Sequence, residues 1–599
     1  MNLTSTDCLI TLVYFAVVLG IGYVLIGRVK TSKEFFAAGR ELPAWVCGLA
    51  FASASLGAQE VMGLGAAGAR YGLAAASWFS LGAVPAMLFA GLFMMPLYYG
   101  SKARTTPEFL GLRFDEKTRT LNAGLFAVTA IFGTGISLAL MARIIQALHI
   151  FDGLFRAMDW PLKGIFVFSV AVPAVVVLGY ILLGGLRGAV YNQVLQFVVL
   201  VAGLLPVVLM GLKQTGGWSG LMATAALHPT ANSSHSAAHL AAIGLLLGIV
   251  LGAGTWCTDF RILQIAMAAK TMEAARRTPM LAAVPRLLVA VLLIVPGLVA
   301  ISLPTPRTTT VIREENGAIV HETTVARPEA ELGQGLVPAR TDPATGRPMT
   351  DPDGHPLLDY AMATPNLLLR VLPSGLLGLG LTALLAALMS GIAAGVTAFS
   401  AVFTGDLYQA HMRQDADDGH LLKAGRWTAV SGMALSVATA YAAFRFNNLM
   451  GALLLIFALV NAPVLATFLL GMFWKRATGH GAFAGLIAGT GAALLHHGLT
   501  LCDAARAGLH GGWIGVLHTY PGKLAQAFWT VVFALCANLL VTVTVSVCTE
   551  ARPETELAGL VHWLTPRPEW ARVAWWKRPE TLAVGILLAA LLVLVAIPA

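Results

Sequence analysis

Long apolar blocks recur along the whole 599-residue chain, and they decide what kind of structure it can form. About 20 consecutive apolar residues are enough for one α-helix to cross the hydrocarbon core of a bilayer. Here 57% of the residues are hydrophobic and 12% are charged, whereas soluble domains have about 45–50% and about 25%. Such a composition leaves too little polar surface to cover a water-soluble globule. The sequence therefore predicts an all-α integral membrane protein.

Blocks of this length predict about 14 transmembrane helices. They lie at residues 7–27, 43–66, 73–99, 121–147, 164–184, 188–211, 240–258, 281–303, 374–402, 425–444, 449–472, 480–499, 525–547 and 581–598. Short connections, such as 185–187 and 445–448, make the helices on either side antiparallel.

Lysines and arginines set the predicted orientation, because basic residues gather in cytoplasmic connections. Counted from the N-terminus, the first, third and further odd-numbered connections between the predicted helices hold 25 of the 39 basic residues. The opposite side holds 13, six of them in the long connection 304–373, and long connections count little for orientation. We therefore expect a multi-pass protein of the plasma (inner) membrane with both termini extracellular or periplasmic. The same asymmetry explains the net charge of +9 without a nucleic-acid partner.

The connection 304–373 differs in composition from the rest, with many acidic residues, prolines, threonines and glycines. Within it, β-branched segments flank the Asn316-Gly317 pair, which is a strong signal for a β-hairpin. We expect a small β-structured extracellular cap that serves as a spacer; a role in gating the solute is the second interpretation.

Ionisable residues are rare inside the predicted helices, and such residues are functional candidates by default. They are Glu60, Arg143 and Asp259. Uncharged polar residues accompany them: Ser53, Ser55, Gln59, Asn192, Gln193, Ser390, Thr397 and Asn461.

Two predicted helices, five apart, are rich in glycine. The first has Gly57, Gly63, Gly65 and Gly68, and the second has Gly244, Gly248, Gly252 and Gly254. Interrupted helices at corresponding positions are typical of the inverted repeats of secondary transporters, where unwound backbone binds ions. Glycines also allow helices to pack closely. The glycine pattern alone fits both interpretations equally.

Several segments resemble the solute:sodium symporter family, whose members include the sodium–glucose cotransporters. The motifs are EFFAAGRELPAW (34–45), TPEFLGLRF (106–114), GGLRGAVYNQVLQ (184–196), TWCTDFRILQIAMAAK (255–270), ALMSGIAAGVTAFSAVFTGDLY (387–408) and FLLGMFWKR (468–476). They occur in the family's order and fall on the helices predicted above. The resemblance covers residues 34–480.

The resemblance implies an inverted five-plus-five helix repeat (LeuT-like) that works by alternating access. The expected units are an N-terminal extra helix and link (1–33), a first five-helix repeat (34–211), a second repeat (212–480) containing the insertion 304–373, and C-terminal extra helices (481–599).

The family's sodium ligands transfer in part. Backbone carbonyls fall at Ser53, Leu56 and Ala387, and one of two hydroxyls falls at Ser390, but the other position is Gly391. Because a hard cation wants a full oxygen shell, water, Ser53 or Thr397 would have to replace the missing hydroxyl. The family's coupling aspartate falls at Gln193, which cannot carry charge. We expect coupling or gating roles for Gln193 and Asp259.

The family's sugar ligands transfer less well. Two of its polar positions fall at Glu60 and Phe79, its inner-gate tyrosine falls at Thr255, and only the neighbouring aromatic residue remains, as Trp256. The candidate substrate-binding residues are Ser55, Gln59, Glu60, Trp78, Phe79, Trp256 and Asn461.

Glu60 has two interpretations. As a functional residue, it contacts the solute or exchanges a proton; as a structural one, it is a buried group paired with Gln59, Ser55 or Arg143. We favour function for Glu60 and a structural or ion-pair role for Arg143. Trp256 fits solute stacking and interfacial anchoring equally well.

The sequence thus predicts a secondary active transporter rather than an enzyme. We expect sodium-coupled symport of a small organic solute, with sugars favoured, no cofactor, and sodium as co-substrate. The alternative is a proton-coupled or weakly coupled transporter that uses Glu60. A non-transporting solute sensor ranks lower, because the chain leaves no room for an output domain after its last predicted helix. The expected partners are the solute, sodium and the lipid bilayer, and the chain could act as a monomer.

Overall fold

A computed structural model of the chain describes most of its residues. They are residues 4–147, 155, 158, 164–226, 248–250, 252–304, 308–315, 318–326, 334–340, 349–350, 356–444, 449–502, 511–565, 575 and 578–596. The elements before the long connection are α1 (Ser5–Val24), η1 (Ile26–Arg28), α2 (Ser32–Ala37), η2 (Ala38–Arg40), α3 (Ala44–Ser55), α4 (Ala58–Tyr71), α5 (Ala74–Phe89), η3 (Ala90–Met94), α6 (Met95–Gly100), α7 (Thr106–Arg113), α8 (Glu116–Ala147), α10 (Ile165–Gln214), α11 (Gly217–Ala226), α13 (Phe260–Met267) and α14 (Met272–Ser302). Those that follow are β1 (Thr308–Glu315), β2 (Ala318–Ala326), η7 (Tyr360–Met362), α15 (Ala363–Val371), α16 (Leu376–Val402), η8 (Phe403–Gln409), α17 (Asp418–Phe444), α18 (Leu449–Phe473), α19 (Gly479–Leu499), β3 (Thr500–Cys502), β4 (His518–Tyr520), α20 (Lys523–Cys548), η9 (Glu554–Leu557), η10 (His562–Leu564) and α21 (Pro579–Ala596).

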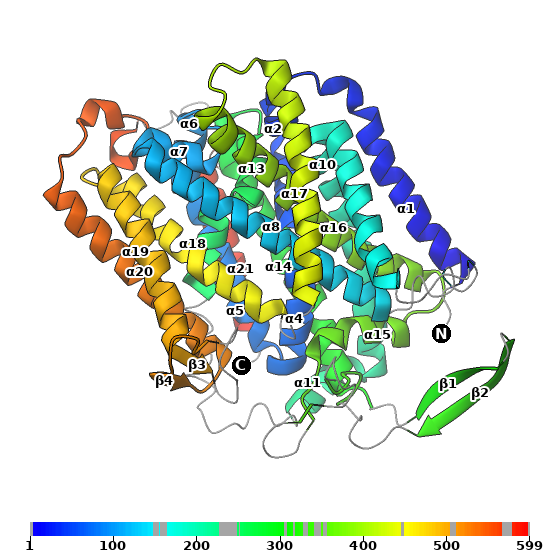
Figure 1. The fold of residues 1–599 in the computed structure, drawn as a ribbon. Coiled ribbons are helices and arrows are strands. Elements are labelled where there is room, and N and C mark those ends of the chain that lie inside the picture. Colours follow the sequence, from blue (N-terminus) through cyan, green and yellow to red (C-terminus); the bar gives the residue numbers. More distant parts are fainter. Residues whose placement is uncertain are drawn as a thin grey trace.

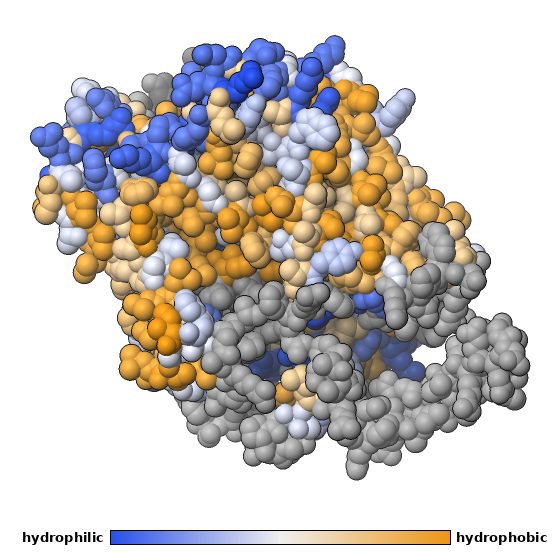
Figure 2. All heavy atoms as spheres, in the orientation of Figure 1, coloured by the Kyte–Doolittle hydropathy of each residue, from blue (hydrophilic) through white to orange (hydrophobic). Residues whose placement is uncertain are grey.

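The molecule is a bundle of long apolar helices (Figure 1). Within the described residues, eight helices are long and apolar enough to cross a membrane, and four shorter apolar helices accompany them. Figure 2 shows a broad hydrophobic belt below a hydrophilic end, as lipid contact requires. The all-α membrane fold is confirmed, whereas the number of 14 crossings stays a prediction.

The 50-residue helix α10 is two membrane helices in sequence, not one. Gly185 interrupts it with φ 56° and ψ −152°. A Cβ on Gly188 would lie 3.2 Å from the Tyr180 carbonyl oxygen, although eight residues of straight helix would span about 12 Å. The chain therefore reverses at Gly185, next to the predicted connection 185–187, because only glycine adopts this backbone conformation readily.

The first glycine-rich helix is broken where an ion site was expected. Helix α3 ends at Ser55, Leu56 leaves the helical conformation, and Gly57 is extended before α4 begins. Gly65 and Gly68 of this segment serve packing: a Cβ on Gly65 would meet Thr364, and a Cβ on Gly68 would lie 3.0 Å from the Ile294 carbonyl carbon of α14. Only Gly57 lies at the break.

The second glycine-rich helix breaks at a different place from its glycines. The helix over Gly248–Thr258 gives way to α13 at Asp259, whose backbone is extended. A Cβ on Gly82 of α5 would lie 2.5 Å from the Gly248 carbonyl oxygen, so Gly248 is a packing contact. Gly244 lies outside the described residues. Each interpretation therefore holds in part. The helix is interrupted, but at Asp259, and its described glycines serve close packing.

The predicted hairpin is confirmed. Strands β1 and β2 pair antiparallel with Thr308 opposite Ala326, and the register shifts between Arg313 and Glu314. The turn at Asn316-Gly317 lies outside the described residues. The hairpin projects away from the helical body (Figure 1).

Candidate functional site

The break in the first core helix positions a cluster of polar side chains inside the bundle. Glu60 stands in the first turn of α4, directly after the break, and α14 lies alongside. Nη2 of Arg286, on α14, donates a hydrogen bond of 3.0 Å to Oε1 of Glu60, and Nη1 lies 3.0 Å from Oε2. Nη1 also donates a hydrogen bond of 2.8 Å to the hydroxyl of Ser55, the last residue of α3. The guanidinium thus bridges both sides of the break.

Trp256 completes this cluster. The Arg286 guanidinium carbon lies 4.4 Å from the centre of the Trp256 ring, which is within cation–π distance. Phe51 of α3 packs against the same ring, with 5.6 Å between centroids. As a result Trp256 is only 2% exposed. A solute can stack on this indole ring only after Arg286 or Phe51 moves. We call Ser55, Glu60, Trp256 and Arg286 the Glu60 cluster.

The Glu60 cluster is electrically balanced but unevenly buried. The Arg286 side chain is 3% exposed, whereas that of Glu60 is 24% exposed. A buried guanidinium needs its carboxylate, because an unpaired charge at this depth is costly. The accessible group is therefore the carboxylate, a hydrogen-bond acceptor that can receive solute hydroxyl or amino groups.

Arg286 is the residue that the sequence reasoning missed. It lies within the predicted helix 281–303, so the rule that singled out Glu60 applied to it equally. The expected partners of Glu60 included Arg143, and here the structure differs: the cationic partner is Arg286. The two residues are 226 positions apart, and no local pattern links them.

The residues expected to bind sodium converge between α3 and α16. The hydroxyl oxygens of Ser53 and Ser390 are 3.0 Å apart, and both residues are buried. Leu56 and Ala387 are each 1% exposed. The hydroxyl of Ser53 therefore lies beside that of Ser390, the hydroxyl ligand that the family resemblance implies.

Gly391 lies against the helix break. A Cβ on Gly391 would be 2.9 Å from the Cα of Gly57. A larger side chain at this position would therefore push the unwound backbone away from α16. Thr397, a possible substitute ligand, is engaged elsewhere: it accepts a hydrogen bond from Gln264 and donates one to the Ala393 carbonyl.

The residues expected to couple or gate lie in two places. Gln193 is 1% exposed in α10, and its Oε1 has no hydrogen-bond partner among the described residues. Asp259 caps α13 and forms a bidentate ion pair with Arg261. Together with Asn122, Asn461 and Thr258, this ion pair lines a small cavity of about 20 Å³.

Asn461 thus lines a cavity to which no residue of the Glu60 cluster contributes, although Gly254 beside it belongs to the helix that carries Trp256. Arg143 is half-buried in α8. The side chains of Gln59, Trp78 and Phe79 lie outside the described part of the chain.

Another ion pair with a buried carboxylate joins elements at the polar end of the bundle. Asp406, fully buried in the π-helical segment η8, accepts hydrogen bonds from Arg119 Nε at 2.7 Å and from the Thr105 hydroxyl at 2.6 Å. It thereby ties the end of α16 to the start of α8 and to the cap of α7. The sequence reasoning did not single out these three residues.

Comparison with known proteins agrees with this geometry. Residues 35–329 and 353–489 match the model of the sodium:solute symporter family. The chain is 26% identical over 503 residues to a sodium/glucose cotransporter of Vibrio parahaemolyticus, covering 81% of this chain and 84% of the relative. It is 27% identical over 517 residues to human sodium/myo-inositol cotransporter 2, covering 82% of this chain and 69% of the relative.

A solved structure shares the fold. A Na⁺-coupled sialic acid symporter in a substrate-bound, outward-open state superposes with a TM-score of 0.69 at 17% identity. The match covers 92% of this chain and 99% of the other. The inverted-repeat (LeuT-like) architecture is thus confirmed.

Proposed function

Because the chain belongs to the sodium:solute symporter family, we propose that it transports a small polyhydroxylated solute, a sugar or a cyclitol, together with sodium. Among its relatives are a sodium/glucose cotransporter and a sodium/myo-inositol cotransporter. The observation that carries the proposal is the position of the Glu60 cluster at the break of the first core helix.

In this proposal Glu60 accepts hydrogen bonds from solute hydroxyl groups. Arg286 orients the carboxylate, because it donates a hydrogen bond to it and its own side chain is buried. The Ser55 hydroxyl, held by the same guanidinium, adds a second polar contact. Trp256 becomes available for stacking when the solute displaces Arg286 from its ring.

Sodium binds, we propose, at the carbonyls of Ser53, Leu56 and Ala387 and the hydroxyl of Ser390. The Ser53 hydroxyl supplies the oxygen that Gly391 cannot, since it already lies 3.0 Å from the Ser390 hydroxyl. Sodium would hold the break in α3 and α4 against α16. The gradient then does work on the solute, about 2.3 kcal/mol for each charge per 100 mV of membrane potential.

Uptake into proteoliposomes tests this function. The purified chain is reconstituted, and radiolabelled glucose, galactose and myo-inositol are supplied with an inward sodium gradient or with potassium in its place. We expect sodium-dependent accumulation of at least one of the three in the wild type and its loss in Glu60→Ala. Accumulation that is equal with and without sodium contradicts the proposed coupling.

Proton coupling is the second candidate, and two observations favour it: Gly391 lacks the second hydroxyl, and Gln193 lacks the charge of the family's aspartate. An inward pH gradient without sodium then drives uptake in the wild type. Glu60→Gln should abolish that uptake if Glu60 carries the proton. Undiminished pH-driven uptake in Glu60→Gln rules this candidate out.

A further inference from the structure

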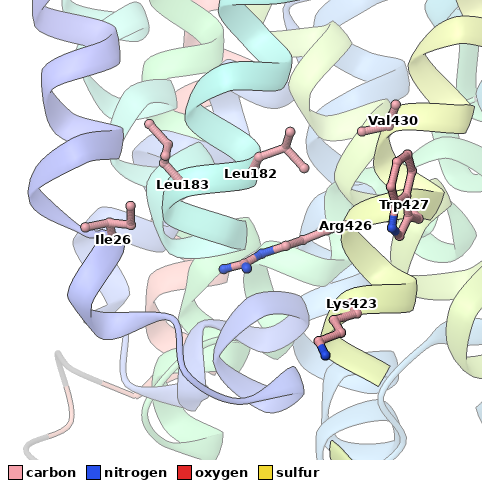
Figure 3. A pocket seen from close by; sticks show the side chains of 7 residues that line it. All are labelled: Ile26, Leu182, Leu183, Lys423, Arg426, Trp427 and Val430. Atoms are coloured by element: carbon pink, nitrogen blue, oxygen red, sulfur yellow. The ribbon is translucent and has the colours of Figure 1, made fainter. Parts of the chain in front are cut away.

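A groove of about 380 Å³ opens on the outside of the bundle, near the turn at Gly184 and Gly185. Its lining residues come from η1, from α10 just before that turn, and from the first turns of α17 (Figure 3): Ile26, Leu182, Leu183, Lys423, Arg426, Trp427 and Val430. The walls are apolar, and Trp427 is 73% exposed. The groove lies at the end of the bundle that we predict to face the cytoplasm.

Within the described part of the chain, the two cations of this groove have no hydrogen-bond or ion-pair partner. Lys423 and Arg426, about one turn apart on α17, make no hydrogen bond or ion pair with any residue that the structure describes. The Nε of Arg426 is buried and lacks an acceptor. Buried donors without a partner are uncommon in proteins and costly, so this nitrogen indicates an acceptor that comes from outside the chain.

None of the described residues that line the groove is acidic. The nearest carboxylates along α17 are occupied: Asp418 accepts hydrogen bonds from Ser32, and Asp417 accepts one from the His420 amide. A cation that merely reached for water would extend away from the bundle. Figure 3 instead shows Arg426 reaching across the groove toward Leu182 and Ile26.

We propose that this groove binds one anionic phospholipid. The phosphate accepts hydrogen bonds from Arg426 and pairs with Lys423, since a guanidinium matches the geometry of phosphate oxygens. One acyl chain lies on Leu182, Leu183 and Val430. Trp427 stands at the level of the lipid headgroups, where tryptophan is enriched.

The amphiphilic shape of the groove favours a lipid over a soluble anion. A free phosphate would satisfy the cations but leave the apolar walls uncovered, whereas a lipid covers both. Basic pockets between membrane helices are known to hold acidic lipid headgroups. The bound lipid would join η1, which precedes the first predicted repeat, to α10 and α17 of the core.

Native mass spectrometry of the full-length protein in detergent tests the proposal, with phosphatidylglycerol and phosphatidylcholine added in parallel titrations. We expect the wild type to bind phosphatidylglycerol in preference to phosphatidylcholine. The double variant Lys423→Ala/Arg426→Ala should bind phosphatidylglycerol about 25-fold more weakly, at about fivefold for each cation. Arg413→Ala removes an exposed cation at the same end but outside the groove, and it should bind like the wild type.

A second variant keeps both cations. Val430→Trp fills the groove and should also weaken phosphatidylglycerol binding, which distinguishes a groove from general surface attraction. Retained phosphatidylglycerol affinity in either the double variant or Val430→Trp overturns the proposal, and so does equal affinity for phosphatidylcholine. Displacement of the lipid by millimolar glycerol 3-phosphate would identify a soluble phosphate site and overturn it as well.

Discussion

The guanidinium of Arg286 and the carboxylate of Glu60 join α14 to α4 through two contacts of 3.0 Å at the break of the first core helix. A second hydrogen bond from the same guanidinium reaches Ser55, on the other side of the break. One arginine therefore fixes the geometry of the unwound segment. Any movement of α4 relative to α14 during transport has to stretch or replace this pair.

Arg286→Ala should destabilise the protein strongly. It leaves the Glu60 carboxylate without its partner, and breaking a buried pair costs about 3–5 kcal/mol, toward the lower end here because Glu60 is partly exposed. The Tm measured by scanning fluorimetry should fall clearly, and uptake should be lost. Lys475→Ala breaks an exposed pair with Glu554 and should leave the Tm within about 1°C, since such pairs contribute at most about 1 kcal/mol. Equal Tm values for the two variants would contradict the role given to Arg286.

Ser53→Ala and Ser390→Ala should each raise the sodium concentration needed for half-maximal uptake. Each variant removes one of two hydroxyls that lie 3.0 Å apart, and a sodium site with fewer oxygen ligands is weaker. Thr397→Val is the matched control, because Thr397 lies on the same helix but bonds to Gln264. Uptake measured over a range of sodium concentrations checks the prediction. A sodium dependence that only Thr397→Val alters would place the ion elsewhere.

Gly391→Ser introduces the hydroxyl that the family resemblance implies at this position, yet we expect it to lower uptake. Its Cβ would lie 2.9 Å from the Gly57 Cα, closer than Cβ atoms approach other carbons, so the break has to move away from α16. Gly124→Ser, a helical glycine with open space around it, is the control and should transport normally. Tighter sodium dependence with full uptake in Gly391→Ser would show that the contact yields easily.

Asp406→Ala should destabilise the polar end of the bundle by about 3 kcal/mol, because it leaves Arg119 and Thr105 without their shared acceptor. Glu116 is the other acidic partner of Arg119, and its side chain is 63% exposed. Glu116→Gln should therefore lower the free energy of unfolding by less than about 1 kcal/mol. Thermal unfolding of both variants beside the wild type measures the difference. A similar loss of stability in the two variants would mean that the buried Asp406 stabilises the protein no more than the exposed Glu116 does.

The carboxylate of Glu34 should give a small acid-sensitive contribution to stability. Backbone hydrogen bonds from Lys30 and Thr31 hold the pKa of Glu34 below its usual range. A lowered folded-state pKa means that the contribution is present above about pH 4.5 and is lost as the pH falls through the lower folded value. Glu34 should titrate between about pH 5 and about pH 3. Over this range the Tm of the wild type should therefore fall more than the Tm of Glu34→Gln. Parallel curves for the two proteins would exclude this contribution.

Features that depend on neighbouring residues were predictable from the sequence. The hairpin follows from β-branched segments on either side of Asn316-Gly317, and the reversal in α10 lies beside the predicted connection at 185–187. The break near Gly57 was expected from the glycines and from the family resemblance. The break at Asp259 shows the limit of this reasoning, because the glycines before it serve packing against α5.

The sequence by itself determined that the chain is a multi-pass membrane protein and that it reverses near 185–187, since the length of apolar blocks and the backbone freedom of glycine at Gly185 act locally. Only the tertiary structure decided which distant residues lie together. Glu60 pairs with Arg286, the Ser53 hydroxyl lies within hydrogen-bond distance of the Ser390 hydroxyl, and Gly391 packs closely against Gly57. These partners are hundreds of positions apart. Their pairing depends on how whole helices pack, and in the membrane interior a charge without a partner is too costly to leave unpaired.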